Sequence, residues 1–503
     1  MLKTSPVFQL IKSMNMSEKR YFKLNSSMHV IGEKNNYAVL FDILDKSDSE
    51  DELKIKKELQ KRSIKVDYFS ADKNYLYQQL IKSLNEFHQE KTINLVIKGL
   101  LMSIEILFHK GLYPEVLKLI NRTEKLALKC ENFPLLIDVL NWKKKALGYS
   151  FGLEKASSVN QEIEKYIRTI NQLKKITDLY YQSYEIQSQF EKKPSKEARE
   201  KLKKIIEQRE IRDDTTMLSF NANVYRMLIH SHYYFISDEK QKELFILEGL
   251  LTELKKNEIY TSENPLDYIS IFNRFLEIKK QLRHDDLYLH LKLLREFPKG
   301  ISIRKEIAEE RVFVLCNTHE LENFLLNDDY QKTVVKIKEI EKNILKFNLS
   351  IEPYYLIHFY YFNAISLLFM GENRKAVKFI FTVLNRFELK DRPQLFRRLE
   401  LLNLIAHFEL GNTELLRSLS KKIISENKND GILLDFEVKL INCMNTLSSK
   451  KRSSEMERKL YWEELRQELV SEKNKSGFGV ESLLVNYLKW IDSKSKRKRV
   501  SDL

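Results

Sequence analysis

Glycine and proline are scarce in this chain. The 503 residues include 12 Gly and 8 Pro, together about 4%, where about 12% is usual. So few turn-forming residues exclude an architecture with many β-hairpins, and they exclude the glycine-rich loops that cradle nucleotide phosphates. Hydrophobic residues still make up 43% of the chain, so a large core is expected. Helices joined by short polar turns satisfy both observations, and we predict an all-α protein.

Cysteines and long apolar runs are also few. The three cysteines, Cys130, Cys316 and Cys443, lie far apart, which argues against a disulfide framework and against a zinc site. No uncharged apolar run of about 18 residues occurs, so no transmembrane helix is expected. The apolar stretch near the start is too short for a signal peptide. These absences predict a cytoplasmic protein that does not insert into a membrane.

Motifs for catalysis and metal binding are missing as well. No HExxH, CxxC or GxSxG sequence occurs. His230 and His232 are two residues apart, so on a helix they point about 200° away from each other and cannot share an ion. His284, Asp285, Asp286 and His290 offer ligand atoms, but their spacing fits no single helical face, and the aspartates are typical of a helix cap. We therefore predict a non-enzymatic protein without a metal or another cofactor.

The chain is rich in charge of both signs. It has 86 Lys and Arg against 71 Asp and Glu, a formal net charge of +15. This balance indicates either a charged helical surface or a basic patch for nucleic acid or anionic lipid. The basic tail 494–499 is either a solvated terminus or a nucleic-acid or acidic-partner contact. Helical patterns within residues 36–90 are compatible with a helix-turn-helix unit. A nucleic-acid-associated regulator is thus the alternative function.

The helical patterns divide the chain into four predicted zones. Residues 1–91 form a helical subdomain, and residues 92–300 form helical hairpins with longer helices, including a continuous pattern from 153 to 190. Residues 301–449 return to regular hairpins. Residues 450–503 hold the last helices and the basic tail.

One pattern recurs in three places: an apolar helix, a glycine, and a second apolar helix. Two of these glycines are 40 residues apart. Glycine at the end of a helix is typical of a left-handed C-terminal cap. In the first copy an aromatic residue follows the turn, and in the second copy a small residue stands on either side of it. The residues assigned to packing within the repeats are Gly111, Tyr113, Ala364, Gly371, Ala376 and Gly411.

This pattern resembles the tetratricopeptide repeat (TPR), whose helix pairs use small residues where the helices cross. Leu404 and Leu416 replace the small residues in the third copy, and the spacing of 40 exceeds the usual 34 or so, which implies longer helices. The resemblance implies a TPR-like α-solenoid of stacked antiparallel helical hairpins, with an N-terminal helical subdomain. Residues 9–15 and 18–23 are also similar to bacterial helical-repeat proteins, a similarity that implies no function.

In TPR proteins the first helix of each pair lines a concave groove. The resemblance therefore implies groove-facing positions in each of the three copies. Most of them are apolar or aromatic, so the Lys and Asn clamp that binds a terminal carboxylate in some TPR proteins is not expected. The positions are Lys98, Leu101, Glu105 and Phe108 in the first copy, His358, Tyr361, Ile365 and Leu368 in the second, and Arg398, Leu401, Ile405 and Phe408 in the third.

Two interpretations of these positions remain open. The groove binds an apolar or amphipathic segment of another protein, or the chain closes on itself and buries the same residues. Residues 354–362 are apolar nearly all round the helix, which is typical of a helix buried between neighbours. Under the first interpretation the chain is a protein-binding scaffold, and the partner-binding residues are Lys98, Leu101, Glu105, His358, Tyr361, Arg398 and Leu401.

Overall fold

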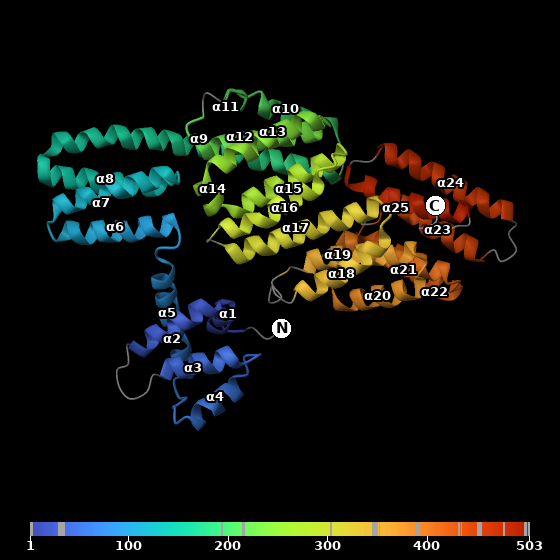
Figure 1. Cartoon of the computed structure of the whole chain (residues 1–503), viewed down its shortest axis with the longest axis horizontal. Helices are drawn as coiled ribbons and strands as arrows, with labels where there is room; N and C mark the ends of the chain where they lie inside the picture. Colours follow the sequence, from blue (N-terminus) through green and yellow to red (C-terminus); the bar gives the residue numbers. More distant parts are fainter. Residues whose placement is uncertain are drawn as a thin grey trace. The chain divides into compact units, whose positions relative to one another are not determined.

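The regular structure in the described part of the chain is helical throughout, and the all-α prediction is confirmed (Figure 1). The computed structural model describes residues 4–28, 36–192, 195–213, 217–301, 304–344, 351, 353–387, 393–430, 433, 435–449, 455–475, 478–496 and 500. The chain divides into two compact units, Met1–Asn171 and Gln172–Leu503. Their boundary falls inside one long helix, α9 (Leu153–Lys192), which confirms the continuous helical pattern predicted there.

The first unit has two separate apolar cores. One joins α1 to α5 around Phe41 and Leu76, and the other joins α6, α7, α8 and the first part of α9 around Ile104 and Leu136. The helices are α1 (Pro6–Ser13), α2 (Met16–Met28), α3 (Asn36–Lys46), α4 (Glu52–Lys61), α5 (Phe69–His88), α6 (Ile93–His109), α7 (Tyr113–Lys129) and α8 (Phe133–Phe151).

The second unit continues with helices that pack mainly on their neighbours in the chain. They are α10 (Lys196–Ile206), α11 (Arg209–Arg212), α12 (Phe220–Ile236), α13 (Lys240–Lys256), α14 (Glu258–Glu263), α15 (Pro265–Gln281), α16 (Leu287–Glu296), α17 (Lys305–Leu326), α18 (Tyr330–Ile344), α19 (Pro353–Phe369), α20 (Asn373–Arg386), α21 (Pro393–Glu409), α22 (Thr413–Asp430), α23 (Asp435–Ser449), α24 (Glu455–Lys475) and α25 (Phe478–Lys496), with a 3₁₀ helix at Phe297–Gly300.

Helices α17, α19, α21 and α23 form a continuous row within this unit. Each of them packs on the next, and each of α18, α20 and α22 also packs on the odd-numbered helix that follows it. Helix α19 is enclosed by this arrangement, and every residue from 359 to 369 is buried. The burial of α19 agrees with its apolar sequence, because a helix with neighbours on all sides needs no polar face.

The three predicted glycine caps are confirmed. Gly111, Gly371 and Gly411 have φ values of +75°, +76° and +70°. After each glycine, the next N–H donates to a carbonyl five residues back: Leu112 to Leu107 over 3.1 Å, Glu372 to Leu367 over 2.9 Å, and Asn412 to His407 over 3.0 Å. This pattern is a Schellman motif, in which a left-handed residue lets the chain reverse and satisfies the last helical carbonyls.

The same turn also occurs where the sequence has no glycine. Asp329 donates to Phe324 over 2.8 Å, and Asn132 donates to Ala127 over 3.0 Å. The left-handed positions of this set are Ser63, Glu131, Asp238, Arg283 and Asp328, with φ between +52° and +60°. A residue with a Cβ pays about 1 kcal/mol or more in this conformation. These turns explain why the repeat is faint in the sequence, since a glycine marks only some of them.

The other repeat-packing residues occupy varied environments. Ala364 and Ala376 are fully buried in the core of the second unit, where α19 packs on α20. Tyr113 lies half-buried in the first unit, with its ring stacked on that of Tyr149 at 5.6 Å.

Candidate functional site

The predicted groove positions of α19 and α21 belong to one core. Tyr361 is 4% exposed and Leu401 is 0% exposed, and Ile365, Leu368 and Ile405 are buried with them. His358, Arg398 and Phe408 are only partly buried. Tyr361 and Leu401 thus lie inside the protein rather than on a free surface, as in the interpretation in which the chain closes on itself. Their role in partner binding stays a prediction.

The predicted residues of the first copy lie on α6, in the other unit. Lys98 and Glu105 are exposed there, and Leu101 is buried in the core that α6 shares with α7 and α8. The side chain of Phe108 is partly buried and contacts Trp142 edge to face, at 5.3 Å between ring centroids. The groove positions of the first copy therefore belong to a different unit from those of the second and third copies.

The last described helix, α25, contacts α21, α23 and the turn between α17 and α18. We call the surface of α21, α23 and this turn beneath α25 the covered face. Tyr487 of α25 is buried, and its hydroxyl donates to Glu437 Oε1 of α23 over 3.3 Å. Burial raises the pKa of Tyr487 well above its usual value, and Glu437 and Tyr361 add to the increase. The hydroxyl therefore keeps its proton and acts as a donor.

A second anchor of α25 is Trp490. Its indole N–H donates to Glu409 Oε1, at the end of α21, over 2.7 Å. Lys494, one turn further along α25, donates to Glu409 Oε2 over 2.6 Å. Trp490, Trp462 and Phe408 pack edge to face, with ring centroids 5.3 to 6.0 Å apart. One carboxylate and one aromatic cluster thus hold this turn of α25 against α21.

Ion pairs at the rim complete the contacts of α25. Lys489 pairs with Asp328 in the turn between α17 and α18, and Asp492 accepts from Arg466 Nε of α24 over 2.7 Å. The covered face therefore combines aromatic and aliphatic side chains with three acidic residues, Asp328, Glu409 and Glu437. Such a surface can recognise an amphipathic helix that carries aromatic anchors and lysines.

Sequence reasoning assigned no role to α25. A usable signal was present, because Tyr487, Trp490, Ile491 and Lys494 follow the i, i+3, i+4, i+7 spacing of one helical face. The sequence does not show which other helices this face of α25 contacts. Lys494 belongs to the predicted basic tail, and in the structure it is paired with Glu409. Residues 497–499 of that tail lie outside the described residues.

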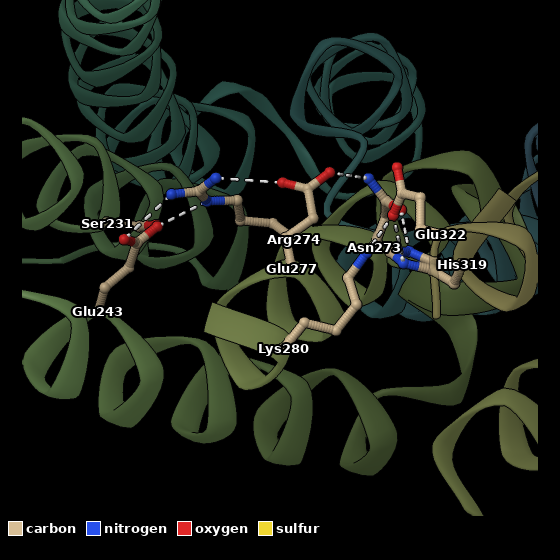
Figure 2. A network of polar contacts seen from close by, with 8 residues as sticks. All are labelled: Ser231, Glu243, Asn273, Arg274, Glu277, Lys280, His319 and Glu322. Carbon is tan, nitrogen blue, oxygen red and sulfur yellow. Dashed lines mark hydrogen bonds and ion pairs between the residues drawn. The ribbon is translucent and has the colours of Figure 1, made fainter. Parts of the chain in front are cut away.

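A buried polar network links α12, α13, α15 and α17 in the same unit (Figure 2). Arg274 holds Glu243 through two hydrogen bonds, from Nε to Oε1 over 2.7 Å and from Nη2 to Oε2 over 3.1 Å. Its Nη1 donates to Glu277 Oε2 over 3.1 Å, and Ser231 Oγ donates to Glu243 Oε1 over 3.3 Å. The Arg274 guanidinium also lies 4.4 Å from the ring centre of Phe235. Glu243 is buried, so its charge depends on Arg274.

The network continues through Asn273 to His319. Asn273 Nδ2 donates to Glu277 Oε1 over 2.9 Å, and Asn273 Oδ1 lies 2.8 Å from His319 Nε2. Burial, with a smaller contribution from the Lys280 charge, lowers the pKa of His319 to about 3. The imidazole is therefore neutral near neutral pH. Lys280 of α15 pairs with Glu322 of α17.

The pKa of Glu322 is the second electrostatic feature of this end of the network. Burial by itself raises this pKa, but the Lys280 charge leads the nearby groups that outweigh burial and lower it. His358 of α19, one of the predicted groove residues, is also near enough to Glu322 to influence its pKa. The charged groups of the network pair with one another, which is typical of a structural link between helices.

The histidine pairs considered in the sequence have separate structural partners. His232 is buried with Nδ1 2.8 Å from Ser183 Oγ, whereas His230 is half-buried with Nε2 3.2 Å from the Ile211 carbonyl. His290 Nδ1 donates to the Asp286 carbonyl over 2.9 Å. His230 and His232 thus contact different partners, as expected of two residues that point away from each other. Asp286 occupies the N-cap position of α16, as the sequence indicated, but its side chain pairs with Lys279 and makes no capping hydrogen bond.

The described residues offer neither a metal centre nor a single membrane-spanning helix. In the described residues no group of three or more His, Cys, Asp or Glu side chains could hold a metal ion. Over the same residues, no single helix is long and apolar enough to cross a membrane, although α5 and α6 meet the length and composition criteria together as a pair bent by 103°.

No protein-family profile, curated protein or solved structure matches the chain.

Proposed function

We propose that this protein is a non-enzymatic scaffold of the TPR-like α-solenoid type, which binds an amphipathic helix of another protein on the covered face. The observation that carries the proposal is that this face already holds a helix, α25, through the anchors Tyr487 and Trp490. A surface that packs aromatic anchors and pairs lysines has the chemistry of a helix-binding groove. The succession of helical hairpins closed by Schellman turns supports the solenoid assignment.

Two of the cations on which the nucleic-acid alternative depends are already paired. Lys73, in the segment considered for a helix-turn-helix, pairs with Glu50, and Lys494 pairs with Glu409. A phosphate contact by either lysine would first have to break an ion pair within the chain. Protein binding is therefore the function that we favour.

A site-specific photo-cross-linking experiment tests the proposed function. A photo-reactive phenylalanine analogue replaces Arg398, a partly buried residue of α21 whose charge acts on Tyr487. The matched control carries the same analogue at Phe381 on α20, which is 66% exposed. The full chain is expressed in its native cells, irradiated, and purified with and without nuclease. We expect a defined protein to be cross-linked from position 398, regardless of nuclease, and not from position 381. Equal products from both positions, or products that nuclease removes, would contradict the proposal.

A further inference from the structure

The way in which α25 contacts the covered face differs from the way in which it contacts α24. Helix α24 packs closely along α25, whereas the described links from α25 to α21, α23 and the α17–α18 turn are made by side-chain ends. Each of the polar links ends at a carboxylate: Tyr487 at Glu437, Trp490 and Lys494 at Glu409, and Lys489 at Asp328. The acidic groups of the covered face thus select a helix with hydroxyl, indole and ammonium donors at set positions.

Not all of these links hold α25 equally firmly. Asp328 is 54% exposed and Lys489 is 26% exposed, and the pair of Arg466 with Asp492 is also at the surface. Exposed ion pairs contribute about 0–1 kcal/mol each. The attachment therefore depends mainly on the two aromatic anchors and on the buried Ile491. A second helix with the same anchors can make the same contacts, so the face is suited to exchange of one helix for another.

We propose that α25 is a built-in occupant of the covered face, and that a partner helix displaces it by presenting the same pattern. That pattern has an aromatic hydroxyl at position i, a lysine at i+2, a tryptophan at i+3, an aliphatic residue at i+4 and a lysine at i+7. It is the spacing of Tyr487, Lys489, Trp490, Ile491 and Lys494. This inference rests on the proposed function, because it names the chemistry of the partner for the same face.

The tether gives α25 an advantage over a free helix. A segment joined to its site by a short connection acts at an effective concentration of about millimolar. A free peptide with the same contacts therefore binds the full chain weakly, and it binds more tightly when the contacts of α25 itself are weakened. This competition supplies a direct test that needs no knowledge of the natural partner.

The probe is a fluorescein-labelled peptide with the sequence of residues 484–496, and its binding to the full chain is followed by fluorescence anisotropy. One variant reverses two charges of α25, Lys489→Glu with Lys494→Glu, so that each new carboxylate faces Asp328 or Glu409. We expect the peptide to bind this variant at least about tenfold more tightly than the unchanged chain. Lys496→Glu, at the exposed end of α25, is the control and leaves the affinity unchanged. A peptide with alanine in place of its tryptophan does not bind.

Unchanged peptide affinity in the double variant would overturn the inference and make α25 a permanent part of the core. Native-state hydrogen exchange on the unchanged chain provides a second measurement if the double variant fails to fold. We expect the amides of residues 487–496 to exchange at least about tenfold faster than those of 401–406 in α21, because a displaceable helix opens without global unfolding. Equal protection of both segments would likewise overturn the inference.

The two proposals fail in different ways. If α25 does not exchange but a protein is still cross-linked from position 398, the partner binds beside α25 and only the displacement is wrong. If the peptide competes as expected but no protein is cross-linked, the covered face accepts helices and the scaffold function is wrong.

Discussion

Helices α6 and α19 begin similar hairpins, each closed by a glycine cap, yet they have different surroundings. Both are strongly apolar along most of their length. In α6, Met102 is 63% exposed and Ile106 is 51% exposed, whereas α19 is buried from residue 359 to residue 369. Similar helices thus become an open face in one unit and the centre of a core in the other. The neighbours of a helix, rather than its composition, decide which of its residues are available for binding.

The largest test of this contrast replaces one apolar residue in each region by glutamate. Leu401→Glu puts a carboxylate into a fully buried site of α21, and we expect a loss of at least about 4 kcal/mol in the free energy of unfolding. Ile106→Glu, on the exposed face of α6, is expected to change it by less than about 1 kcal/mol. Chemical denaturation followed by circular dichroism measures both. A folded and stable Leu401→Glu chain would show that this residue faces a groove after all.

A smaller loss of stability is expected when one charge is removed from a buried ion pair, and the comparison is the same change in an exposed ion pair. Arg274→Ala leaves Glu243 buried without its cation, which costs about 3–5 kcal/mol. Arg168→Ala removes an exposed partner of Glu164 on α9, which costs about 0–1 kcal/mol. Denaturation followed by tryptophan fluorescence reports on both units, because Trp142 lies in the first and Trp462 and Trp490 lie in the second. Similar losses from both substitutions would mean that the network in Figure 2 does not stabilise the fold.

Buried and exposed histidines should respond differently to acid. Burial lowers the pKa of both His232 and His319 from 6.5 to about 3. Because the unfolded chain binds protons more readily at these two sites, their contribution to stability is complete above about pH 6.5 and is lost as the pH falls toward 3. Each histidine then contributes a slope that approaches about 1.4 kcal/mol per pH unit.

Stability measured between pH 6.5 and 5.0 tests this prediction. His232→Gln should lower the slope of stability against pH by the contribution of one histidine. His109→Gln, at an exposed position at the end of α6, is the matched control. An unchanged slope in His232→Gln would show that His232 is protonated in the folded chain.

The smallest expected effect concerns the turns. Gly371→Ala places a Cβ at a φ of +76° and should destabilise the second unit by about 1 kcal/mol. Arg283→Gly removes a Cβ from a left-handed position at +57° and should stabilise it by about 0.5–1 kcal/mol. Thermal unfolding measures both shifts in melting temperature. If the two substitutions change stability in the same direction, turn conformation is not the cause.

Much of the fold was predictable from local features of the sequence. The scarcity of glycine and proline predicted the helices, and Gly111, Gly371 and Gly411 marked three of the turns correctly. The turns at Glu131 and Asp328 were not predicted, because residues other than glycine adopt the left-handed conformation there when packing of the adjoining helices offsets its cost. The structure also divides the chain inside α9, whose unbroken helical pattern contains no sign of a boundary.

The candidate site was predictable only in part. Spacing within a helix is local, so the sequence by itself determined which residues share a face: Tyr361 with Ile365 on α19, Leu401 with Ile405 on α21, and Tyr487 with Trp490 on α25. Only the tertiary structure decided that α25 covers α21 and α23, and that Glu409 and Glu437 receive its indole and hydroxyl donors. The reason is physical. An apolar face gains free energy against any complementary surface, and the choice among such surfaces depends on contacts between residues 50 to 161 positions apart in the chain.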